Sequence, residues 1–202
     1  MTNTAAAALL AAVLVASTAP PALAGEPTDA IRRHVDQALA VLRDPALAGT
    51  AHAEARRTRI RDIAREAFDF TEMSRRALGR HWQARTPAER ERFVRLFTEL
   101  LEKAYFSRID SYDGGSIKYV GEDVDGDAAT VRSSVLTDKG SSIRVDYLMH
   151  RNGGKWLVAD VAVEGVSLIG NYRTQFNRVI TTSSYADLVK RLENKAAGTP
   201  GS

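Results

Sequence analysis

The chain has 202 residues, a net charge of +3 at pH 7 and no cysteine, and 44% of its residues are hydrophobic. A chain of this size can form one domain with a substantial core. The lack of cysteine excludes disulfide bonds. The small positive charge argues against a dedicated nucleic-acid-binding protein, whose basic residues are normally more numerous and clustered.

The N-terminus has most features of a secretory signal peptide. Residues Ala5–Ala16 are almost wholly apolar and uncharged, and they are too few to span a bilayer. Ala22-Leu23-Ala24 fits the small-residue rule for cleavage, so we expect the mature chain to begin at Gly25. Met1–Thr4 lack the usual Lys or Arg, and a frayed helix is the alternative. We therefore predict a signal peptide over 1–24, a single soluble exported domain over 25–195, and a flexible tail over 196–202.

Apolar residues at helical spacing predict four helices before residue 110. Thr28 and Asp29 are the expected caps of the first, and Gly79 is the expected end of the third. In Thr86-Pro87-Ala88-Glu89 we recognise a capping box with proline at the first helical position. The first, second and fourth helices are predicted over 30–43, 53–67 and about 87–109. The third is predicted to start at Asp69-Phe70-Thr71 and to end at Gly79.

The pattern changes after Asp113-Gly114-Gly115 to apolar runs separated by turn residues. Four strands are predicted over 117–121, 128–137, 143–150 and 155–163. Asp125-Gly126 and Asn152-Gly153 have hairpin-turn composition. Two helices over 168–180 and 185–195 complete the chain. Helices followed by antiparallel strands indicate an α+β fold with helices packed on a curved four-stranded antiparallel sheet.

The chain lacks the usual motifs of catalysis and metal binding. Its four histidines are scattered, without the spacing of paired metal ligands, and neither a nucleophile elbow nor a phosphate-binding loop is present. We therefore expect no metal site, no cofactor and no enzymatic activity.

Two carboxylates leave an alternative open. Asp160 lies within an apolar strand and Asp146 precedes Tyr147, so an inward-facing set could transfer protons as in an isomerase. The alternative that we favour is structural: each carboxylate caps backbone N–H groups or pairs with Arg144 or Arg173. The arginines between Arg56 and Arg65 similarly form either a solvated helix face or a basic patch for anionic headgroups or an acidic partner.

Several stretches, taken together, resemble the MlaC family, also called the toluene-tolerance or ABC-transporter auxiliary family. The resemblance covers nearly the whole mature chain in order and with similar spacing. The stretches that carry it are Phe68-Asp69-Phe70, Met73, Leu78-Gly79-Arg80-His81-Trp82, Thr86-Pro87-Ala88-Glu89-Arg90, Phe93, Phe97, Leu101, Tyr105, Tyr147, Trp156, Val158, Asp160-Val161, Glu164-Gly165-Val166-Ser167-Leu168, Asn171-Tyr172-Arg173 and Phe176.

The resemblance implies a periplasmic phospholipid carrier that maintains outer-membrane lipid asymmetry. Its expected cargo is phospholipid. Its expected partners are an inner-membrane ABC transporter complex with its substrate-binding subunit and an outer-membrane lipoprotein complex. The family fold resembles the nuclear-transport-factor-like α+β cone, with acyl chains in an apolar cavity and the headgroup in solvent. We expect a monomer that binds no nucleic acid.

Large apolar groups from one helix, several strands and the segment after them are the candidates to line this cavity. The face assigned to each strand depends on its register, because a slip of one residue inverts it. The predicted lipid-binding residues are Phe97, Leu101, Tyr105, Val131, Val135, Val145, Tyr147, Trp156, Val158, Val161, Val163, Val166, Leu168, Tyr172 and Phe176. Besides the isomerase-like enzyme, an adaptor that carries no lipid remains an alternative.

Overall fold

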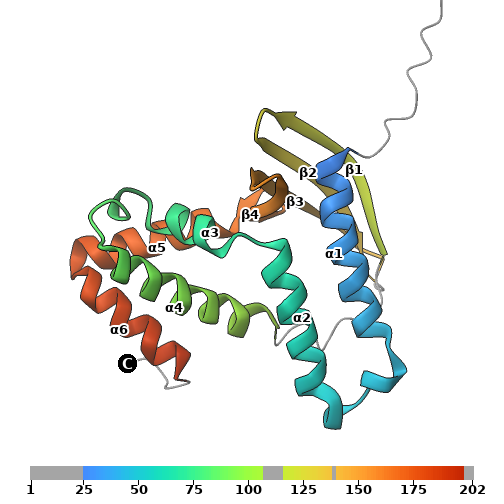
Figure 1. Cartoon of the computed structure of the whole chain (residues 1–202), viewed down its shortest axis with the longest axis horizontal. Coiled ribbons are helices and arrows are strands. Elements are labelled where there is room, and N and C mark those ends of the chain that lie inside the picture. Colours follow the sequence, from blue (N-terminus) through green and yellow to red (C-terminus); the bar gives the residue numbers. More distant parts are fainter. Residues whose placement is uncertain (1–24, 107–115, 138–139, 198–202) are drawn as a thin grey trace, which may run out of the picture.

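The computed structural model describes residues 25–106, 116–137 and 140–197, which form six α-helices and one antiparallel sheet (Figure 1). The helices are α1 (Glu26–Arg43), α2 (Ala53–Ala67), α3 (Phe70–Leu78), α4 (Pro87–Phe106), α5 (Leu168–Thr182) and α6 (Tyr185–Ala196). The strands, in their order across the sheet, are β1 (Ser116–Asp125), β2 (Ala128–Leu136), β3 (Ser142–Asn152), β4 (Lys155–Val163) and β5 (Val166–Ser167). The α+β prediction is confirmed, while the predicted signal peptide lies outside the described residues.

Local capping signals mark several helix ends. Asp69 accepts a hydrogen bond from the Glu72 backbone N–H at 2.8 Å, and Gly79 ends α3 with φ +53°, a conformation that favours glycine. The Thr86–Glu89 capping box forms in both directions, at 2.8 and 3.2 Å. These features agree with the sequence expectation.

Two details differ from the prediction. Helix α1 begins at Glu26, and the Thr28 hydroxyl does not cap it but donates to the Glu122 carboxylate of β1. The sheet has five strands instead of four, because the turn at Glu164-Gly165 lets Val166 pair back with Val163. The first feature depends on a contact between distant segments and the second on a tight turn. Neither can be predicted from helix or strand periodicity.

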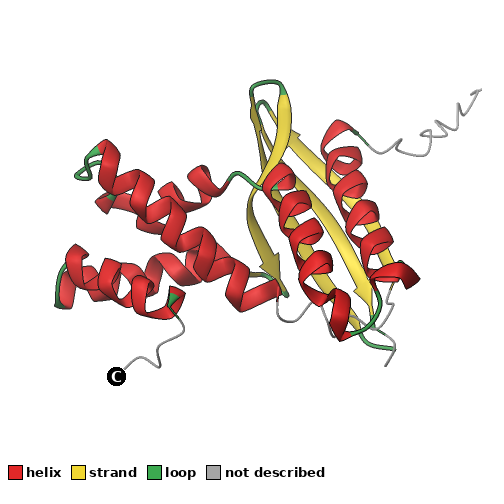
Figure 2. Ribbon diagram, turned by 60° about the horizontal axis from the view of Figure 1, so that its bottom comes forward, coloured by secondary structure: helices red, strands yellow, loops and turns green. Residues whose placement is uncertain are grey.

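The helices form two groups relative to the sheet. Helices α1 and α2 cover one face of the sheet, while α3, α4, α5 and α6 form a bundle beyond β4 (Figures 1 and 2). Each group has its own buried cluster: one is aromatic and lies within the bundle, and the other lies between α1 and the sheet. Among the described residues, no helix combines the length and apolar character that crossing a membrane requires.

An ion cluster in α3 gives stability a pH dependence. The Glu72 carboxylate accepts two hydrogen bonds from Arg75, both 2.6 Å, and one from Arg76 at 2.7 Å. The Arg75 hydrogen bonds, with help from Arg76, lower the pKa of Glu72 from about 4.5 to about 2 against the opposing effect of burial. Between these values only the unfolded chain binds the proton, so the cluster stabilises the fold above pH 4.5 and loses this effect as the pH falls toward 2.

We expect Glu72→Gln to lower the free energy of unfolding by about 1 kcal/mol at pH 7, because both guanidinium groups are partly solvated. Urea unfolding should show this difference shrinking steadily between pH 4.5 and pH 3. Glu91→Gln, which removes the solvent-exposed partner of Arg95, is the matched control and should change little. A Glu72→Gln difference that stays constant over this range would contradict the assignment.

Candidate functional site: an apolar cavity between the two layers

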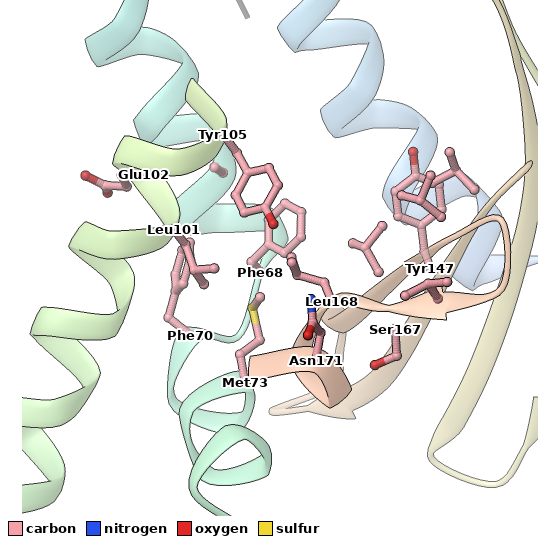
Figure 3. A pocket seen from close by; sticks show the side chains of 15 residues that line it. Phe68, Phe70, Met73, Leu101, Glu102, Tyr105, Tyr147, Ser167, Leu168 and Asn171 are labelled. Atoms are coloured by element: carbon pink, nitrogen blue, oxygen red, sulfur yellow. The ribbon is translucent and has the colours of Figure 1, made fainter. Parts of the chain in front are cut away.

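A cavity of about 460 Å³ lies between the helical bundle and the sheet (Figure 3). Its walls come from α2, α3, α4 and α5 on one side and from β3, β4 and β5 on the other. The lining residues are Ala64, Phe68, Phe70, Met73, Leu101, Glu102, Tyr105, Val145, Tyr147, Val161, Val163, Val166, Ser167, Leu168 and Asn171. Hydrocarbon and aromatic groups dominate, so the cavity favours apolar ligands.

One end of the cavity faces solvent. Tyr105, Val163 and Val166 line it and are 41%, 46% and 65% exposed, whereas the lining residue Met73 is 2% exposed. Tyr147 is buried, and this burial raises the pKa of its hydroxyl, which therefore stays protonated near neutral pH. The cavity thus has a closed apolar interior and a mouth bordered by large apolar side chains.

Two of the polar groups in the wall, Glu102 and Ser167, already have partners within the protein. The Glu102 carboxylate accepts from Arg61 Nε at 3.0 Å and from Arg65 Nη2 at 3.4 Å. The Ser167 hydroxyl donates to Asp160 Oδ2 at 2.5 Å. A ligand inside the cavity therefore meets few polar groups that need new hydrogen bonds.

Two carboxylates hold the ends of the cavity wall in place. Asp69 accepts from His150 at 3.0 Å and from Asn152 at 2.9 Å, which ties the α2–α3 junction, and with it Phe68 and Phe70, to the β3–β4 hairpin. Asp160 accepts backbone N–H groups of Val161 at 2.8 Å and Ile169 at 3.0 Å.

Asp160 thereby fixes the first turn of α5. Ser167 caps that helix through the Gly170 N–H, at 2.7 Å, while its own hydroxyl is held by Asp160. This places Leu168 and Asn171 against the cavity (Figure 3). The structural role expected for Asp160 is the one observed.

The groups considered for proton transfer do not converge. Asp146 pairs with Arg144 at 2.6 Å and alternates with Tyr147 along β3, so the two side chains lie on opposite faces of the sheet. Asp160 pairs in register with Leu148 and so shares the Asp146 face. Tyr147 lines the cavity without either carboxylate.

The structure brings eight of the fifteen predicted lipid-binding residues to the cavity: Leu101, Tyr105, Val145, Tyr147, Val161, Val163, Val166 and Leu168. Seven lie elsewhere. Phe97, Tyr172 and Phe176 pack against one another in the bundle in edge-to-face and tilted pairs, with ring centroids 5.1 to 5.5 Å apart. Val131, Trp156 and Val158 pack in the cluster between α1 and the sheet, and Val135 is half-buried on β2 opposite Ile143.

A β-bulge decides which residues of β4 face inward. Val158 pairs with Met149 and Asp160 with Leu148, which leaves Ala159 as an extra residue. Strict alternation would place Val158 and Val161 on opposite faces of the sheet. Because Ala159 is an extra, unpaired residue between them, both side chains lie on the inward face. The Val161 and Val163 side chains reach the cavity for the same reason.

The sequence reasoning missed one wall, formed by Ala64, Phe68, Phe70 and Met73 with the polar groups Glu102, Ser167 and Asn171. The available signal was the Phe68-Asp69-Phe70 segment, where two large aromatic residues flank a helix cap. The basic face of α2 is largely engaged within the protein: Arg61 and Arg65 pair with Glu102, and Arg56 donates to the Leu47 carbonyl at 2.8 Å.

Known proteins share this sequence pattern and fold. The profile of the family described as MlaC protein matches residues 32–194. The intermembrane phospholipid transport system binding protein MlaC of Haemophilus influenzae is 23% identical over 127 residues, which cover 60% of this chain. The chain spans 59% of the length of that curated relative.

A solved structure has a similar fold. It is the phospholipid-binding protein of Ralstonia solanacearum in complex with a phospholipid, and it superimposes with a TM-score of 0.75 and 23% identity. The superposition covers 86% of this chain and 98% of that chain. It supports the α+β fold with its helices beside an antiparallel sheet.

The matched residues run from α1 to α6 and include every residue that lines the cavity. The family profile thus spans well over half of the chain, and it confirms the resemblance carried by the Phe68, Thr86 and Glu164 segments. We conclude that the chain belongs to the MlaC family.

Proposed function

We propose that this protein is a periplasmic phospholipid carrier that moves lipid between an outer-membrane lipoprotein complex and an inner-membrane ABC transporter. The supporting observation is the cavity: about 460 Å³, apolar, closed at one end and open beside Tyr105, Val163 and Val166. The phospholipids named for its relatives in Haemophilus and Ralstonia give the cargo class. In this proposal the acyl chains enter the cavity and the headgroup stays in solvent.

The energetics favour retention without a polar recognition site. Each buried methylene contributes about 0.8 kcal/mol, so ten of them contribute about 8 kcal/mol, which corresponds to a dissociation constant of about 1 μM. The chain needs no cofactor and no catalytic group for this role, and we propose that it acts as a monomer. The isomerase alternative gains no support, since Asp146 and Asp160 lie on the face of the sheet away from Tyr147.

The cavity also gives a reason to expect bound lipid in the purified protein. An empty, dry space costs about 24 cal/mol per Å³, or about 11 kcal/mol for about 460 Å³, which is comparable to the total stability of a typical domain. Water entering at the mouth lowers this cost, so the figure is an upper bound. Filling the cavity with acyl chains removes it.

Native mass spectrometry of the purified protein should show added masses of phospholipids, which organic extraction then identifies. Removing the lipid by exchange into excess cyclodextrin should lower the melting temperature by about 5–10 °C, because a ligand at 100 times its dissociation constant stabilises by about 2.7 kcal/mol. Adding phospholipid back should restore the melting temperature. A homogeneous lipid-free mass with a melting temperature insensitive to lipid would support the adaptor alternative instead.

A further inference from the structure

A second concave region lies outside the apolar cavity, between α3 with the following turn and α5, which run side by side (Figure 1). Two hollows of about 500 Å³ each share Gly170 and Arg173 and so form one groove. Arg75 and Arg76 line one hollow, Arg80 and His81 line the other, and Arg173 lies between them. We call these five residues the basic groove.

Positive charge exceeds negative charge in the basic groove. Asp160 is the acidic residue in its lining, and that carboxylate is buried and already accepts from Val161, Ser167 and Ile169. Glu72 pairs with both Arg75 and Arg76. Arg80 donates to the neutral Asn177 side chain at 2.9 Å, so neither it nor Arg173 is neutralised by any carboxylate in the groove lining.

The guanidinium group of Arg173 lies close to Gly79, at the end of α3. A side chain at position 79 would meet Arg173 Nε at 2.8 Å, so glycine leaves the space that this guanidinium occupies. The positive φ of Gly79 also favours glycine there. Arg173 lines both hollows of the groove, and a planar guanidinium group binds carboxylates with two parallel hydrogen bonds.

We propose that the basic groove docks a carboxylate-rich segment of a partner protein. The groove is recessed between two helices, so an extended acidic segment can enter it, whereas a flat membrane surface cannot bring its headgroups to both walls. The groove also adjoins the cavity, because Ser167 lines both. A partner seated in the groove would contact the β5–α5 junction that carries Ser167 and Leu168. This docking surface does not depend on the lipid proposal.

Fluorescence anisotropy with a fluorescein-labelled peptide of alternating glutamate and serine, measured at about 50 and 150 mM salt, tests this docking surface. The double variant Arg80→Glu/Arg173→Glu should bind the peptide at least about tenfold more weakly than the wild type. The matched double variant Arg33→Glu/Arg191→Glu, which changes two exposed arginines on α1 and α6, should stay within about twofold. Glu72→Gln frees Arg75 and Arg76 and should tighten binding by about threefold.

The proposal is overturned if the wild type does not bind the peptide or if both double variants lose affinity equally, since net charge alone would then explain binding. It is also overturned if Arg80 and Arg173 are needed to bind vesicles with 30% phosphatidylglycerol and the peptide does not compete. Bound phospholipid, measured in the same samples, should be unchanged in every variant. A wild-type protein that carries lipid but does not bind the peptide would contradict only the docking proposal. A wild-type protein that binds the peptide but carries no lipid would contradict only the carrier proposal.

Discussion

Replacing Val163 with tryptophan should deprive the protein of its lipid while leaving it folded. The Val163 side chain lines the cavity and is 46% exposed at the mouth, so a larger ring can extend over the opening without entering a packed core. Overpacking a closed core commonly costs 1–3 kcal/mol, and this position should cost less. We expect co-purifying phospholipid to fall at least about tenfold by mass spectrometry, with an unchanged circular dichroism spectrum.

A matched variant and a neighbouring one sharpen this test. Val120→Trp adds the same ring to an exposed valine of β1 that does not line the cavity, and should carry normal lipid. Val145→Trp changes the residue directly opposite Val163 in the sheet and should reproduce the loss. Folded Val163→Trp and Val145→Trp proteins with normal lipid content would show that acyl chains bind elsewhere.

The second large effect is expected from Asp160→Asn. The carboxylate accepts from two backbone N–H groups and the Ser167 hydroxyl while 6% exposed, and an amide of the same shape cannot accept all three. Hydrogen bonds to a charged group contribute about 1.5–3 kcal/mol, so we expect the free energy of unfolding to fall by about 2–3 kcal/mol. Urea unfolding should show a midpoint lower by about 1 M with an unchanged slope.

This substitution also separates the structural role of Asp160 from a catalytic one. The folded fraction of Asp160→Asn should still carry phospholipid, because the side chain points away from the cavity. Asp125→Asn, at the exposed end of β1, is the control and should leave the midpoint within about 0.2 M. Wild-type stability together with a lost chemical activity would favour the isomerase alternative.

Features encoded by neighbouring residues were predictable from the sequence. The capping box at Thr86–Glu89, the glycine end of α3 and the hairpin turns at Gly126 and Gly153 each depend on a few adjacent residues, and all form as expected. The family resemblance depended on the same segments, since they combine a cap or turn with large apolar residues.

The cavity wall was harder to predict because it depends on contacts between distant segments. Phe97 and Phe176 have the same character as Leu101, yet the rings pair with each other in the bundle, 5.3 Å apart, and leave Leu101 to line the cavity. Phe68 and Phe70 reach the cavity through the tie between Asp69 and the β3–β4 hairpin, which residues 150 and 152 supply. Helical periodicity cannot distinguish a side chain that fills a core from one that borders an empty space.

The extra residue in β4 has a consequence for the chemistry of the interior. With no bulge at Ala159, strict alternation from Trp156 would turn Asp160 inward and Val161 and Val163 outward. A carboxylate would then lie among the apolar side chains of the cavity, where desolvating a charge is costly. The bulge lets β4 present an apolar face to the cavity while Asp160, on the opposite face, holds the first turn of α5.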